Sequence, residues 1–102
     1  MNAVVQEKRA EIEALCREHA VERLFLIGSA TGAEFDATKS DVDFLVVFRA
    51  QARSGYDDVF FRLLEKLEAL FGRPVDLIEA RTLKNPYMIA SVNRTKQLLY
   101  AA

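Results

Sequence analysis

DFLVVF, residues 43–48, is the strongest signal for a β-strand in the chain. Valine and aromatic residues fit the pleated, half-buried surface of a sheet, and neither glycine nor proline interrupts this run. Two more apolar runs predict buried strands: VERLFLIG (21–28), which ends in glycine, and VDLIEA (75–80), which follows Pro74.

Apolar residues recur at helical spacing on either side of these strands. Residues 57–71 predict an amphipathic helix that ends before Gly72. Residues 4–19 predict another, whose stripe of less polar side chains has charged residues between its members: Val5, Ile12, Leu15, Cys16 and His19. We interpret Cys16 as a small core residue and His19 as a residue at the end of the helix.

The remaining segments are less regular. Residues 29–40 suit a loop or a helix start, and residues 51–55 suit a polar loop. The tail predicts a short helix from about Pro86 and a last strand at 97–100. The order helix, strand, loop, strand, helix, strand, tail indicates a mixed α/β fold.

Length and composition predict one soluble domain over residues 1–102. Half of the chain, 51%, is hydrophobic and 28% is charged. No apolar run approaches the roughly 20 residues that cross a bilayer, and the charged N-terminal stretch lacks the apolar segment of a signal peptide. One cysteine cannot form an internal disulfide, so we expect a reduced, cytoplasmic location and no membrane partner.

The net charge of −1 does not favour direct nucleic-acid binding. Positive charge does gather at the end of the chain, where residues 80–102 contain no acidic residue and four basic ones: Arg81, Lys84, Arg94 and Lys96. This basic tail is either a solvated helix face or a surface for a nucleotide or an acidic partner.

Three carboxylates lie at the edges of apolar strands. Asp41 and Asp43 are two positions apart, so strand alternation turns both to the same face. Asp76 interrupts the run 75–80, where burial of a lone carboxylate would cost several kcal/mol unless a cation or a set of donors met it. If the three meet, divalent ions must neutralise them, and hard oxygen ligands suit Mg²⁺ or Mn²⁺.

Gly28 and Ser29 follow the first predicted strand. Glycine lets a phosphate approach the backbone, and the N–H groups of a turn bind its oxygens. The pattern that combines this pair with Ser40, Asp41, Val42 and Asp43, a following apolar strand and PVDLIE resembles the nucleotidyltransferase superfamily related to DNA polymerase beta. Within it, the size and the ending LKNPYMIASVNRTKQLLY are similar to the minimal, MntA-like nucleotidyltransferases.

The resemblance implies a small mixed β-sheet with helices packed on one side. It implies catalysis with two Mg²⁺ ions, Mn²⁺ being the alternative, held by Asp41, Asp43 and Asp76, with Asp76 completing the site that activates the attacking hydroxyl. Nucleotide-binding residues would be Gly28 and Ser29, joined by Ser40 and Lys39 beside the acidic pair. The donor would be ATP, and AMP would go to a tyrosine of a HEPN-type toxin, for which this chain would be the antitoxin.

The segment after Ser29 departs from the pattern of the resemblance. Such proteins commonly carry one or two arginines there, whereas Lys39 is the only basic side chain between Ser29 and Asp41 in this chain. Lysine contacts phosphate as a point charge and lacks the bidentate geometry of arginine. This leaves two alternatives open: a catalytically degenerate antitoxin that neutralises its partner by contact, and transfer to a small molecule such as an aminoglycoside.

Overall fold

The computed structural model describes residues 2–28, 42–50 and 56–102, and the backbone alone for 56–58. None of the helices in this part of the chain is long and apolar enough to cross a membrane. In chain order, the elements are α1 (Ala3–Glu7), α2 (Arg9–Glu18), β1 (Val21–Ile27), β2 (Val42–Phe48), α3 (Tyr56–Phe71), β3 (Val75–Glu79), the 3₁₀ turn η3 (Ala80–Thr82), α4 (Pro86–Thr95) and β4 (Gln97–Ala101).

The four strands form one mixed sheet in the order β3-β2-β1-β4. β1 runs antiparallel to both β2 and β4, while β2 and β3 are parallel neighbours joined through α3. The mixed sheet and each of the predicted strands are therefore confirmed, including the short strand at the end of the tail.

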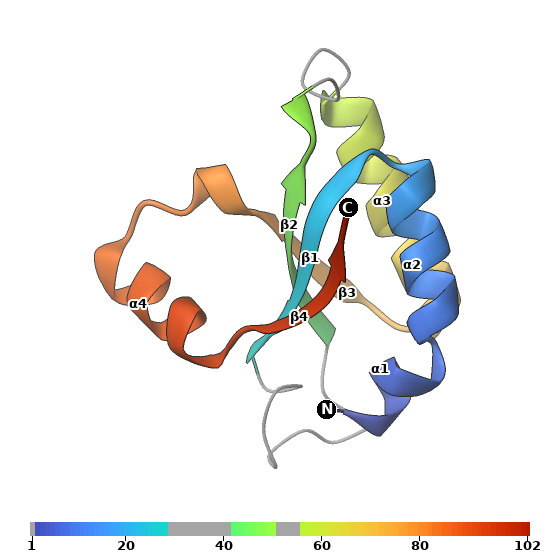
Figure 1. Ribbon diagram of the computed structural model, residues 1–102, viewed down its shortest axis with the longest axis horizontal. Helices are drawn as coiled ribbons and strands as arrows, with labels where there is room; N and C mark the ends of the chain where they lie inside the picture. The colour runs from blue at the N-terminus through green and yellow to red at the C-terminus, as the bar shows by residue number, and fades with distance from the viewer. Residues whose placement is uncertain (1, 29–41, 51–55) are drawn as a thin grey trace.

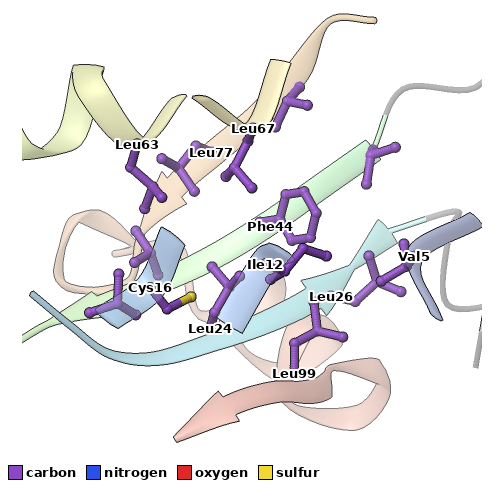
Figure 2. Packing of buried hydrophobic residues seen from close by; sticks show 14 of the residues in the cluster. Val5, Ile12, Cys16, Leu24, Leu26, Phe44, Leu63, Leu67, Leu77 and Leu99 are labelled. Atoms are coloured by element: carbon purple, nitrogen blue, oxygen red, sulfur yellow. The ribbon is translucent and has the colours of Figure 1, made fainter. Parts of the chain in front are cut away.

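One face of the sheet carries the main core, which α1, α2 and α3 cover (Figure 1). Every second residue of the central strands points into it, as the alternation of a strand requires. In Figure 2, Ile12 of α2 and Leu67 of α3 lie near Phe44 of β2. Cys16 of α2 lies beside Leu24 of β1 in the same core. The prediction of helices packed on one side of the sheet holds for these three helices.

The opposite face of the sheet is covered in part by α4, which lies apart from the other helices (Figure 1). Val92 of α4 packs on Ile27 of β1 and Leu45 of β2, with Leu83 and Ile78 at the edge of this smaller cluster. The tail helix thus adds a second, thinner layer. Any side chain that alternates with the main core on β1, β2 or β3 faces this layer.

The single helix predicted for residues 4–19 is wrong in one respect, because the chain breaks at Lys8 into α1 and α2. The apolar stripe has no apolar residue one turn after Val5: Lys8 and Arg9 occupy those positions. Core packing therefore does not hold this turn, and the chain changes direction between the buried side chains of Val5 and Ile12.

Candidate active site

Asp43 and Gly28 meet where β1 ends and β2 begins. Asp43 pairs with Ile27 across the antiparallel ladder, so the next residue of β1, Gly28, lies against the Asp43 side chain. A Cβ added to Gly28 would collide with Asp43 Oδ2 and stand 3.2 Å from its Cγ. Gly28 also has a φ of +73°, a conformation that side-chain-bearing residues rarely adopt. The positive φ favours glycine, and the close approach of Asp43 Oδ2 leaves no space for a side chain.

Asp76 lies directly beside Asp43 in the sheet. The two residues are register partners in the parallel pair of β2 and β3, where neighbouring strands are about 4.8 Å apart. Both alternate with core residues, so both carboxylates are on the α4 face of the sheet. Asp76 is exposed, whereas Asp43 is partly buried and its Oδ1 is closed off from solvent. Because Asp76 is exposed, the burial cost inferred from its apolar strand does not arise.

The two carboxylates open into a pocket between the sheet and α4, with a volume of about 300 Å³. The sheet contributes Asp43, Asp76 and Gly28 to its wall, next to the apolar Ile27 and Ile78. The helix contributes Met88, Ser91, Val92 and Thr95. A pocket with apolar walls, two carboxylates and a few hydroxyl groups has the usual composition of a small-molecule site.

The sequence sets α4 in this position through its first turn and its middle. Asn85 caps the helix, its Oδ1 accepting hydrogen bonds from the N–H groups of Tyr87 (2.9 Å) and Met88 (3.3 Å), and Pro86 occupies the first turn. Val92, at the centre of the buried stripe, anchors the helix on the sheet. Residues one turn before and after Val92 consequently face the pocket.

Four of the predicted site residues lie outside the described residues: Ser29, Lys39, Ser40 and Asp41. Within residues 2–28, 42–50 and 56–102, no group of three or more histidine, cysteine, aspartate or glutamate side chains is arranged to hold a metal ion. Gly28, Asp43 and Asp76 are brought together at one end of β1, β2 and β3. The donor set there consists of carboxylate oxygens, which suits a hard divalent cation such as Mg²⁺.

Sequence reasoning missed the contribution of α4 to the pocket. Met88, Ser91 and Thr95 recur at spacings of three and four in the tail, which is a helical face, but their hydroxyl and thioether groups are common in ordinary surface helices. This stripe faces the acidic pair only because α4 packs on the side of the sheet that carries Asp43 and Asp76.

The basic tail divides into side chains with local partners and side chains on the surface. Arg81 Nε donates to Glu79 Oε2 at 2.9 Å, and Lys96 Nζ lies 4.6 Å from the centre of the Phe25 ring. Lys84 and Arg94 are exposed. The interpretation of a solvated helix face therefore fits only part of the cluster.

Cys16 and His19 have the structural roles that the sequence predicts. Cys16 is fully buried in the main core, where burial raises the pKa of its thiol to about 12, with a smaller contribution from the Glu13 carboxylate. His19 is the C-cap of α2, and its Nδ1 lies 2.7 Å from the Leu15 carbonyl oxygen.

Comparison with known proteins agrees with this geometry. Residues 10–102 match the family described as polymerase beta, nucleotidyltransferase. A candidate protein adenylyltransferase of Methanocaldococcus jannaschii is 29% identical over 99 residues, which are 89% of this chain and 95% of that protein. A solved structure described as a candidate minimal nucleotidyltransferase is 31% identical, with a TM-score of 0.73, over 91% of this chain and 90% of the other.

A third similarity lies in a complex. The structure of a tri-AMPylated HEPN toxin of Shewanella oneidensis with its MNT antitoxin contains a chain that is 18% identical to this one. It covers 95% of this chain and 72% of the other, with a TM-score of 0.64, and at that identity it shows a shared fold. The match over residues 10–102 shows the family: this chain belongs to the polymerase beta-type nucleotidyltransferases.

Proposed function

We propose that this protein is a magnesium-dependent adenylyltransferase that moves AMP from ATP to a tyrosine of a HEPN-type toxin and thereby acts as its antitoxin. The observation that carries the proposal is the side-by-side placement of Asp43 and Asp76 against Gly28, at the open end of a pocket. The names of the relatives, a protein adenylyltransferase and an antitoxin beside an AMPylated toxin, support this choice of donor and acceptor.

The proposed reaction is an in-line displacement at the α-phosphorus of ATP. The tyrosine oxygen forms a bond to that phosphorus, the bond to the β-phosphate bridging oxygen breaks, and pyrophosphate leaves. The hydroxyl proton passes to a carboxylate, for which Asp76 is placed at the exposed side of the pair. We further propose that the triphosphate contacts the backbone at Gly28, just after β1, and that Ser29, Ser40 and Lys39, which lie outside the described residues, also bind the nucleotide.

Asp43 and Asp76, with Asp41, are the proposed ligands of two Mg²⁺ ions. Bound ions would neutralise the acidic cluster and the charge on the attacking and leaving oxygens. The protein's own part is to hold Asp43 and Asp76 side by side on neighbouring strands, so that the geometry of these two carboxylates does not depend on a loop.

The test is to combine the protein with ATP, Mg²⁺ and the product of the neighbouring gene, which we expect to be helix-rich with an Arg-x4–6-His motif. The mass of that partner should rise by the mass of an AMP group, and the ribonuclease activity that the resemblance to MntA-like antitoxins implies for a HEPN-type toxin should fall. An unchanged partner mass, with a folded enzyme that binds ATP, would contradict the proposal.

Matched variants identify the residues responsible. Asp43→Asn and Asp76→Asn remove one charge each while keeping shape, and each should lower the transfer rate at least about 10²-fold. Glu65→Gln on the exposed side of α3 removes the same charge far from the pocket and should leave the rate unchanged.

The segment that lacks arginine supports a second candidate, a degenerate enzyme that neutralises its partner by contact. The Asp41→Asn, Asp43→Asn double variant separates the two. Neutralisation that survives in this variant supports contact. Loss of neutralisation, with folding and complex formation retained, supports catalysis.

A further inference from the structure

The exposed side of α4 carries large apolar side chains beside the mouth of the pocket. Tyr87 is 86% exposed and Met88 is 45% exposed, and Met88 also lines the pocket wall. Among the large apolar side chains of the described residues, that of Tyr87 is the most open to solvent. An aromatic ring left in water next to a reaction site is a typical anchor for a protein partner.

Helical spacing connects this anchor to the pocket. Tyr87, Ser91 and Arg94 follow one another at intervals of four and three, so they share one face of α4. Ser91 also belongs to the stripe that faces Asp43 and Asp76. The face defined by Tyr87, Met88, Ser91 and Arg94, here called the α4 surface, therefore runs without interruption from solvent to the edge of the acidic pocket.

The charge of the α4 surface is one-sided. Arg94 is exposed on it, Lys84 is exposed just before the helix, and no acidic residue occurs from Ala80 to the end of the chain. The pocket that it borders is acidic. A partner seated on this surface must therefore offer negative charge opposite Arg94 and an apolar recess for Tyr87.

We infer that the α4 surface is the docking surface for the protein whose hydroxyl is modified, and that this acceptor presents an acidic, partly apolar patch to it. The inference rests on the proposed transfer to a protein. Any macromolecular acceptor that brings a side chain to Asp43 and Asp76 must lie over the rim of this pocket, and α4 forms the helical part of that rim.

The experiment measures two quantities for the full chain with the neighbouring gene product: the Kd of the complex and the rate of AMP transfer. The test variants are Tyr87→Ala and Arg94→Glu. The matched controls lie on α3, across the sheet: Phe61→Ala, an aromatic residue that is 58% exposed, and Lys66→Glu, an exposed charge reversal. Binding of a nonhydrolysable ATP mimic is recorded for all four variants.

We expect Tyr87→Ala and Arg94→Glu each to raise the Kd about tenfold or more, while both controls stay within about twofold. The ATP mimic should bind equally to Tyr87→Ala and wild type, and the Kd of the wild-type complex should rise with salt. Test variants that bind the partner as tightly as the controls would overturn the inference.

Other outcomes separate the docking surface from the chemistry. Binding that depends on Tyr87 without any AMP transfer would support the docking surface and refute the proposed function. AMP transfer by wild type, with the Kd of the complex unchanged in both test variants, would support the proposed function and refute the docking surface. Self-association of the chain that Tyr87→Ala abolishes, with partner affinity unchanged, would assign the surface to a second copy and overturn the inference.

Discussion

Gly28 is the residue whose identity the site constrains most tightly among those the structure describes. Its positive φ can be adopted by other residues at a cost of roughly 1–2 kcal/mol. The space beside it cannot be shared, because Asp43 Oδ2 occupies the position of a Cβ. A side chain at this position would therefore displace a proposed metal ligand as well as strain the backbone.

Gly28→Ala and Gly72→Ala separate these two effects. Gly72 also has a positive φ, +64°, but nothing lies within 4 Å of its would-be Cβ. Both variants should lose roughly 1–2 kcal/mol of unfolding free energy from backbone strain. Only Gly28→Ala should also lose nucleotide transfer, by about tenfold or more. Chemical denaturation and transfer assays on both variants check this, and equal transfer rates would show that Asp43 tolerates displacement.

Cys16 provides a prediction on pH. Its folded-state thiol pKa is raised from 9.0 to about 12, so the folded protein holds a proton that the unfolded chain releases above pH 9. The stability due to the neutral buried thiol is complete below pH 9 and is lost as the pH rises from 9 toward 12.

Wild type and Cys16→Ala should therefore differ in the slope of stability against pH. Between pH 9 and 10.5, the unfolding free energy of wild type should fall by about 1 kcal/mol per pH unit relative to Cys16→Ala. Urea unfolding at each pH measures the difference, and below pH 8.5 the two proteins should show parallel curves. Parallel curves up to pH 10.5 would mean that the thiol is not protected as its position in the core implies.

At the scale of elements, α4 takes part both in the smaller core cluster and in the wall of the pocket. It packs on the sheet through few buried residues, chiefly Val92, and its first turn depends on the Asn85 cap. The side chains that it contributes to the pocket are placed only as long as this helix is formed. Local opening of α4 should therefore affect transfer before it affects global unfolding.

Asn85→Ala tests this through the cap. Loss of a cap costs about 1 kcal/mol, which should fray the start of α4, speed hydrogen exchange at the N–H groups of Tyr87 and Met88 and reduce transfer severalfold. Asn2→Ala is the matched control, because Asn2 caps α1 in the same way on the other side of the sheet. A reduction in transfer that is equal in the two variants would argue against a special role for α4.

At the scale of the whole molecule, the sheet separates stability from function. The face toward α1, α2 and α3 holds most of the buried apolar side chains, and the face toward α4 holds Asp43 and Asp76. Strand alternation makes this possible, since one residue of a strand can serve the core while the next serves the site.

Leu67→Ala should show the energetic weight of the main core. Leu67 is fully buried between α3 and the sheet (Figure 2), so its truncation should lower the unfolding free energy by about 2–5 kcal/mol. Phe61→Ala, on the exposed side of the same helix, should cost about 1 kcal/mol or less. Thermal and urea unfolding measure both, and similar losses in the two variants would contradict this assignment of the core.

The four strands and the helices α3 and α4 could be predicted from local pattern, because the period of apolar residues records which side of an element is buried. The break at Lys8 could not be predicted, because the apolar stripe of residues 4–19 resumes at Ile12. Whether the helix stays straight across Lys8 and Arg9 depends on tertiary contacts of that turn, which the stripe does not record. The amphipathic pattern of α4 also did not predict on which side of the sheet the helix packs. Such a pattern shows which face of a helix is buried, but not the surface against which it is buried.

The sequence by itself determined the mixed α/β class, the strands that carry the acidic residues and the family resemblance, since these depend on residue order and spacing. The tertiary structure decided that Asp43 and Asp76 are register partners, that Gly28 lies against the Asp43 side chain and that α4 forms one wall of the pocket. The physical reason is that strand pairing and helix docking are settled by packing between segments far apart in the chain, and no local period encodes that choice.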